Sequence, residues 1–126
     1  MKMMDTPLLL TSFFKRAERY FPHKEIISRT APDTVHRITY AQYAKRTRKL
    51  AHALTKLGMK QGTKVGTFAW NTHRHLEAYF AIPCSGAILH TINIRLAPEH
   101  IIYIINHAED EILLIDGDLF PLVEPA

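Results

Sequence analysis

The alternation of apolar strand-like segments with helical segments in the second half of the chain limits the possible folds more than any other feature. These segments follow in the order strand, helix, strand, helix, strand, at residues 64–70, 72–84, 87–92, 98–108 and 111–115. Continuous apolar strands that alternate with helices are typical of a parallel sheet covered by helices on both faces. We therefore predict an α/β fold with a βαβαβ unit in this half of the chain.

The first half is predicted to begin with a helix and a β-hairpin. Thr11 or Ser12 is expected to cap the helix, which ends before Pro22. Two short strands, at residues 25–29 and 35–39, flank a segment that contains Pro and Asp and reads as a turn. The spacing of the strands favours a short hairpin.

A longer helix with the clearest signals of the chain follows the hairpin. Thr39 and Gln42 have the spacing of a capping box. Gly58 follows the predicted end of the helix, at the position that commonly adopts the left-handed backbone conformation. Side chains recur at three- and four-residue steps, which predicts one buried face made of Tyr43, Thr47, Leu50, Leu54 and Leu57.

Length and composition fit one domain of ordinary size, with two parts at residues 1–62 and residues 63–126. The chain has 126 residues, of which 47% are hydrophobic and 22% charged, an ordinary globular mixture. Its net charge of +4 would help a polyanion approach, such as CoA, nucleic acid or an acidic membrane, but identifies none of them. The single cysteine, Cys84, excludes an internal disulfide and a cysteine zinc site, and indicates a reducing, cytoplasmic location.

No targeting or membrane-spanning segment is predicted. The short apolar run near the beginning of the chain is interrupted by Asp5 and Pro7, and no small-residue cleavage pattern follows it. No stretch approaches the ~18 apolar residues that a membrane-spanning helix needs. Any membrane contact is therefore expected to be peripheral at most.

No catalytic, cofactor-binding or metal-binding residue is predicted from the sequence. The strand that ends at Trp70 is followed by Asn71 and Thr72 rather than by a glycine-rich phosphate loop, so a plain helix cap is expected there. His73 and His75 are two residues apart, and on a helix such residues point to different sides and do not share a metal.

Two further motifs have simple structural interpretations. Asp116-Gly117-Asp118 resembles part of a calcium loop but lacks the remaining ligands, so a turn followed by an Asp helix cap is expected. The basic run at residues 45–49 falls on the polar side of the long helix and is expected to be a solvated face. Because no aromatic or base-reading residues accompany it, nucleic-acid binding is not predicted.

Several short blocks of residues, found in order along nearly the whole chain, together resemble a known family. The most specific block reads WNTHRHLEAYFA at residues 70–81, and GAILHTINIRL at residues 86–96 and YIINHAE at residues 103–109 follow it. The remaining blocks are residues 3–8, 16–19, 21–25, 39–40, 57–58 and 62–65. Their order and spacing resemble the adenylate-forming superfamily, specifically its medium- and long-chain fatty-acyl-CoA synthetases.

The resemblance implies both a fold and a reaction. The chain is expected to be the amino-terminal part of the synthetase large domain, truncated before the phosphate loop that ends in Lys. Full-length members join a fatty acid to CoA by way of an acyl-adenylate, using ATP, Mg²⁺ and CoA. Those groups are expected only in the full-length parent, and the fragment alone is expected to be inactive. The alternative is a stand-alone dimerisation or interaction module derived from such an enzyme.

The resemblance also implies self-association, because relatives of this type are often dimers built through their amino-terminal segments. Phe13, Phe14, Tyr20 and Phe21 lie on one face of the first predicted helix and are the candidate dimer contact. Packing within the core of the chain itself is the alternative for these residues, and the one that we favour. A sheet edge left uncovered by missing partner strands would also promote self-association.

Overall fold

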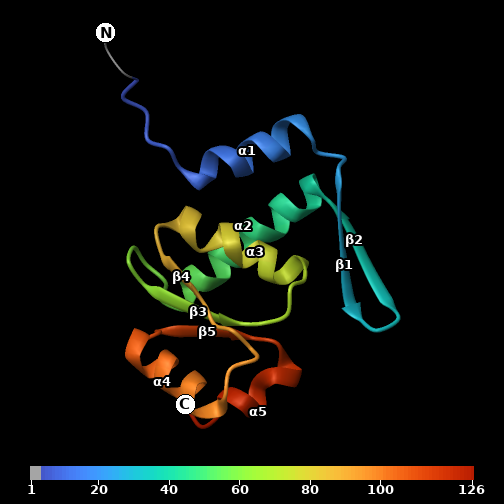
Figure 1. The fold of residues 1–126 in the computed structure, drawn as a ribbon. Helices are drawn as coiled ribbons and strands as arrows, with labels where there is room; N and C mark the ends of the chain where they lie inside the picture. Colours follow the sequence, from blue (N-terminus) through green and yellow to red (C-terminus); the bar gives the residue numbers. More distant parts are fainter. Residues whose placement is uncertain (1–3) are drawn as a thin grey trace.

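A computed structural model of the chain describes residues 4–126 and has the predicted α/β architecture (Figure 1). The first half contains α1 (Leu10–Tyr20), β1 (Glu25–Ala31), β2 (Thr34–Thr39) and α2 (Tyr40–Lys56). The second half contains β3 (Lys64–Phe68), α3 (His73–Ala81), β4 (Ile88–Thr91), α4 (Pro98–Ala108), β5 (Ile112–Ile115) and α5 (Phe120–Val123). Short 3-10 turns at Pro83–Ser85 and Gly117–Leu119 complete the order.

The three strands of the second half form a parallel sheet in the order β4-β3-β5, which confirms the predicted βαβαβ unit. Helices α2 and α3 lie on one face of the sheet, and α4 and α5 lie on the other (Figure 1). Each face has its own buried cluster. Leu54, Met59, Val65, Ala78, Ile82 and Ala87 fill the first cluster. Phe68, Ile92, Ile101, Ile105, Leu119 and Val123 fill the second.

Gly66 lies in the central strand β3, where two side chains pass close to its backbone. A Cβ atom at this position would stand 2.5 Å from Leu113 Cδ2 and 2.9 Å from Asp110 Oδ2. The carboxylate of Asp110 is fully buried and lies 2.8 Å from Nδ1 of His90 on β4. A larger residue here would have to displace the side chains of Leu113 and Asp110, and with Asp110 its pairing with His90, so glycine is favoured.

The hairpin and α2 form as predicted, and α2 begins with the predicted capping box. Strands β1 and β2 pair antiparallel, with a turn at residues 32–33. The Thr39 hydroxyl accepts from the Gln42 backbone N–H at 3.2 Å, and the Gln42 side chain accepts from the Thr39 N–H at 2.9 Å. Gly58 has φ +103°, the left-handed conformation expected after the helix. Leu57 is exposed, so its predicted place on the buried face was wrong.

Two predicted helix boundaries were also wrong. Helix α1 begins at Leu10 with Leu9 at the N-cap position and without a side-chain cap, so neither Thr11 nor Ser12 caps it. Helix α3 ends at Ala81 rather than near Cys84, because Pro83 cannot donate to the preceding turn and a 3-10 turn replaces the last turn of the helix.

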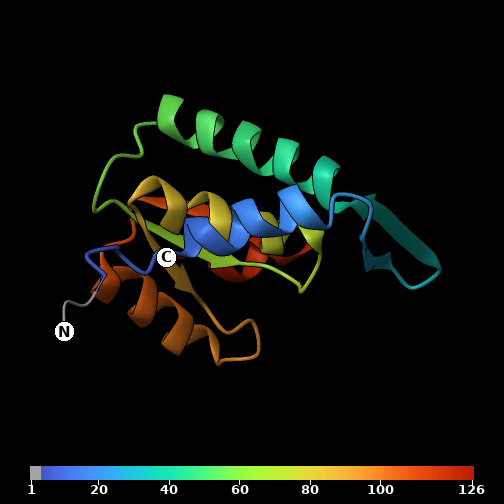
Figure 2. The ribbon, with the colours of Figure 1, turned by 90° about the horizontal axis from the view of Figure 1, so that it is seen from above.

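Seen from above, α1 lies over α3 and alongside α2, and the hairpin projects beyond one end of α2 (Figure 2). The first half of the chain therefore covers one face of the sheet and adds an exposed arm to it.

Along residues 4–126, no helix combines the length and the apolar composition needed to cross a membrane.

Candidate functional site

The aromatic residues of α1 and its C-cap residue, Phe21, divide into one that is packed and three that are exposed. The Phe14 ring lies 6.1 Å from the Tyr43 ring and 6.0 Å from the Phe80 ring, centroid to centroid. The exposed fractions of Phe13, Tyr20 and Phe21 are 69%, 59% and 47%. The favoured prediction of a core role was therefore right only for Phe14, whereas the other three side chains are exposed among residues 4–126.

An ion pair holds α1 against α2 beside Phe14. Both terminal nitrogens of Arg48 donate to the carboxylate of Glu18 at 2.6 Å, and the Arg48 guanidinium lies 5.2 Å from the centre of the Phe14 ring. The hydrogen bonds from Arg48 hold the pKa of Glu18 below its ordinary value of 4.5. A cavity of about 230 Å³ beneath α1 is lined mainly by apolar side chains, including Phe14, Tyr43 and Phe80.

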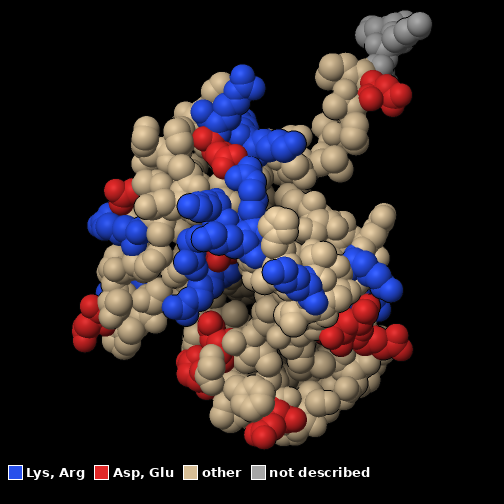
Figure 3. All heavy atoms as spheres, turned by 180° about the vertical axis from the view of Figure 1, so that it is seen from behind, with Lys and Arg blue, Asp and Glu red and all other residues tan. Residues whose placement is uncertain are grey.

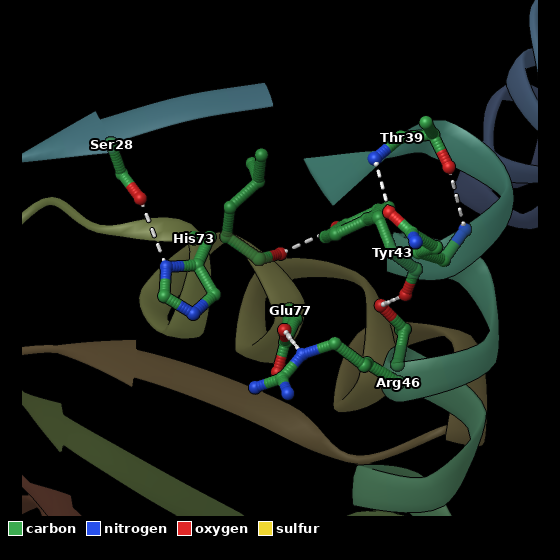
Figure 4. Close-up of polar contacts among 9 residues, drawn as sticks. Ser28, Thr39, Tyr43, Arg46, His73 and Glu77 are labelled. Atoms are coloured by element: carbon green, nitrogen blue, oxygen red, sulfur yellow. Dashed lines mark hydrogen bonds and ion pairs between the residues drawn. The ribbon is translucent and has the colours of Figure 1, made fainter. Parts of the chain in front are cut away.

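The interface between α2 and α3 contains a buried carboxylate that the sequence did not reveal. Glu77 is only 5% exposed, and the Nε atom of Arg46 donates to it at 2.6 Å (Figure 4). The Tyr43 hydroxyl donates to the Leu76 carbonyl at 2.7 Å, and burial raises the pKa of Tyr43. The basic run at residues 45–49 is largely exposed, as predicted, but two of its arginines hold the helices together.

His73 and His75 point to different partners, as their spacing predicted. Nδ1 of His73 is hydrogen-bonded to the Ser28 hydroxyl of β1 at 2.9 Å (Figure 4), and its ring stacks on His36 with centroids 3.9 Å apart. His75 Nε2 lies 2.9 Å from the Thr67 hydroxyl on β3. Burial, together with the nearby charges of His36, Arg46 and Arg74, lowers the pKa of His73 to about 4.

The carboxyl ends of β3 and β5 form the sheet edge at which open α/β sheets usually bind their ligands. A hollow of about 620 Å³ at this edge is lined by residues that include Arg29, Trp70 and Thr72. The Trp70 backbone N–H donates to Asp116 at 2.8 Å, and the indole N–H donates to Asp118 at 2.9 Å. Thr72 occupies the N-cap position of α3 without a side-chain hydrogen bond, so the predicted cap by this hydroxyl was wrong.

Comparison with known proteins decides the family of the chain. The AMP-binding enzyme family matches residues 13–125. The chain belongs to this family. It is 52% identical over 122 residues to a long-chain-fatty-acid–CoA ligase of Thermus thermophilus, a match that covers 97% of this chain and 23% of that ligase. It is 40% identical to a medium-chain-fatty-acid–CoA ligase of Ectopseudomonas oleovorans, covering 97% of this chain and 22% of that ligase.

A solved structure of the same fold is the anthranilate CoA ligase AuaEII in complex with anthranoyl-AMP. It superimposes on 99% of this chain with a TM-score of 0.82 at 26% identity, and the match covers 24% of that ligase. The chain therefore has the fold and sequence of an AMP-binding enzyme over a region equal to less than a quarter of these relatives.

The described residues do not fit the phosphates of a nucleotide, although the family is named for AMP binding. The sheet edge that would meet a phosphate carries the carboxylates of Asp116 and Asp118. The turn between β3 and α3, residues 69–72, contains no glycine. Two carboxylates repel a phosphate, and a turn without glycine cannot bring several backbone N–H groups close to it. Within residues 4–126, no group of three or more His, Cys, Asp or Glu residues is arranged to hold a metal ion.

Proposed function

We propose that this chain is the amino-terminal part of a fatty-acid–CoA ligase, whose complete form joins a fatty acid to CoA with ATP and Mg²⁺ in the cytoplasm. The observation that carries the proposal is the 52% identity to a long-chain-fatty-acid–CoA ligase over 97% of the chain. The fold match to a second CoA ligase over 99% of the chain supports it. A fatty acid, rather than another carboxylic acid, is proposed because the 52% identity to the long-chain-fatty-acid–CoA ligase exceeds the 45% identity to a 3-methylmercaptopropionyl-CoA ligase of Ruegeria lacuscaerulensis and the 26% identity to the anthranilate CoA ligase.

The contribution of this chain to the ligase is structural. The parallel sheet with its two buried clusters is a rigid scaffold, and α1 and the hairpin cover one side of it. Since the described residues carry two carboxylates where a phosphate would approach, ATP is expected to bind to other parts of the complete protein.

The 126-residue chain alone is expected to have no ligase activity. Purified chain, incubated with ATP, Mg²⁺, CoA and a long-chain fatty acid, should release no pyrophosphate and form no acyl-CoA above a protein-free blank. The matched comparison is a longer protein, expressed from the same reading frame extended past codon 126. Activity of the extended protein with an inactive short chain would support the proposal. Turnover by the short chain would contradict the prediction that it is inactive. An extended protein that is folded but inactive would contradict the proposal that the complete protein is a fatty-acid–CoA ligase.

The exposed aromatic residues of α1 favour a second role, which is self-association. Phe13 and Tyr20 are more than half exposed. The Arg16 guanidinium lies 5.5 Å from the centre of the Tyr20 ring, so the surface combines apolar and cationic groups. Aromatic and arginine side chains of this kind are enriched in protein interfaces. A homodimer through α1 is consistent with the ligase proposal and would also suit a stand-alone interaction module.

The double variant Phe13→Gln/Tyr20→Gln is expected to shift the chain from dimer or larger species to monomer. Light scattering over a range of concentrations would measure the change. The control is Tyr103→Gln/Phe120→Gln, which removes two exposed aromatics from α4 and α5 and should leave the mass of the wild-type species unchanged. A monodisperse wild-type monomer at high concentration would contradict self-association.

A further inference from the structure

The charges of the chain are strongly segregated along its sequence. Residues 1–62 contain 13 Lys and Arg against 4 Asp and Glu, and residues 63–126 contain 3 against 8. The net charge of +4 is therefore the difference between a +9 half and a −5 half. Seen from behind, Lys and Arg side chains gather in the upper part of the molecule, whereas most Asp and Glu lie lower (Figure 3). Such asymmetry creates a field that orients the molecule near a charged surface.

Helix α2 is the centre of the positive half. It contains five Lys and Arg and no Asp or Glu. Its buried face includes Tyr43, Thr47 and Leu54, and the side directly opposite carries a stripe of exposed side chains. The members of this lysine stripe recur at steps of four, three and four residues: Lys45, Lys49, His52 and Lys56. At about 1.5 Å of rise per residue, the stripe extends over roughly 16 Å.

The arginines and lysines of α2 have different surroundings. Arg46 is paired with Glu77 and Arg48 with Glu18, so both guanidinium groups bind carboxylates of neighbouring helices. Among residues 4–126, the three lysines of the stripe form no ion pair. The charge that α2 presents to solvent is therefore mainly that of ammonium groups, which are compact point charges without the geometric selectivity of arginine.

We propose that the lysine stripe of α2 is a docking surface for an anionic lipid bilayer. Unpaired lysines along one side of a helix suit the flat, diffuse layer of phosphates on a lipid surface. They suit a single small anion less well, because such a ligand needs a pocket with fixed geometry. The exposed face of α2 has no aromatic side chain on which a nucleic-acid base would stack. The −5 half would be repelled by the same bilayer, so the chain docks with α2 toward the lipid and the acidic half away from it.

Flotation of the purified chain with lipid vesicles tests this docking surface. Wild-type chain should float with vesicles of phosphatidylcholine and phosphatidylglycerol, and not with phosphatidylcholine alone. Added salt should release it, because the attraction is electrostatic. The triple variant Lys45→Gln/Lys49→Gln/Lys56→Gln should weaken partitioning on the order of 100-fold, since each lysine near an anionic surface contributes roughly a fivefold change.

A control with the same loss of charge separates the lysine stripe from net charge. The variant Lys24→Gln/Arg29→Gln/Arg95→Gln removes three exposed charges that lie outside α2 and should partition within a few-fold of wild type. Circular dichroism confirms folding, and Gln is itself a good helix former. Equal weakening of both variants, or wild-type chain that stays off anionic vesicles, would overturn the proposal. Binding to duplex DNA through the stripe without vesicle binding would replace the lipid with nucleic acid.

Discussion

Replacing Phe68 with alanine is expected to destabilise the chain by about 3–5 kcal/mol, the range for truncating a buried aromatic residue. Phe68 is 0% exposed and ends the central strand β3. It belongs to the buried cluster that joins the sheet to α4 and α5. The large loss is expected because the truncation leaves a cavity between a strand and two helices, which cannot collapse without moving both layers.

Phe120 provides the matched control for this variant, because it is also a phenylalanine but is 49% exposed on α5. Phe120→Ala should cost clearly less, roughly 1–2 kcal/mol, because about half of its surface is already exposed in the folded chain. Urea unfolding followed by circular dichroism measures both variants. Similar losses for the two would show that the sheet and its second layer do not form the cooperative core described above.

The elements that could be predicted from the sequence are those specified by local signals. The capping box at Thr39 and the left-handed Gly58 bracket α2, and both depend on residues only a few positions apart. The βαβαβ order follows from apolar runs that are readable without knowledge of the rest of the chain. Because parallel strands need both faces covered, this order also predicted helices on both sides of the sheet.

The contacts that could not be predicted join residues far apart in the sequence. Arg46 and Glu77 are 31 positions apart, and Ser28 and His73 are 45 apart. Nothing local distinguishes Glu77, a buried partner, from the exposed acids of the chain. The start of α1 was also missed. Thr11 and Ser12 have good cap propensity, but the helix begins at Leu10 with Leu9 at the N-cap position and no side-chain cap, so both residues lie within its first turn.

The aromatics of α1 and its C-cap show the same limit at the candidate contact surface. Their spacing predicted one shared helical face, but periodicity does not say whether an apolar face meets the chain itself or another molecule. The position of α1 over α2 and α3 buries Phe14 and leaves Phe13 and Tyr20 outside. The exposed face is a property of how the helix is docked, and it appears only in three dimensions.

The stability of the chain is expected to fall as the pH is lowered from about 6.5 to about 4 because of His73. Burial lowers the pKa of His73 in the folded chain to about 4, from an ordinary value of 6.5. Above pH 6.5 the imidazole is neutral in both states, and its favourable contribution is fully present. Between the two pKa values only the unfolded chain binds the proton, so the folded state loses up to about 3 kcal/mol. Below the lower value both states are protonated and the loss from this residue ends.

His75 acts in the same direction, because burial also lowers its pKa. The carboxylate of Glu18 acts at lower pH, because its pKa in the folded chain lies below 4.5. Its contribution to stability is lost as the pH falls from about 4.5 through this lower pKa. Above pH 4.5, the pH dependence of the free energy of unfolding is therefore expected to come mainly from His73 and His75. Above about pH 5 the contribution of His73 can therefore be measured with little interference from the Glu18–Arg48 pair.

The variant His73→Asn keeps a polar partner near the Ser28 hydroxyl but cannot take up a proton. Urea unfolding from pH 7 down to pH 4.5 should show a flatter pH dependence for this variant than for the wild type. His100→Asn, at an exposed position on α4, should leave the wild-type slope unchanged. Parallel slopes for wild type and His73→Asn would mean that the contact between the hairpin and α3 opens readily enough for His73 to be protonated in the folded chain. If the predicted difference is seen, protonation of His73 disfavours the folded state in which its ring stacks on His36 of the hairpin.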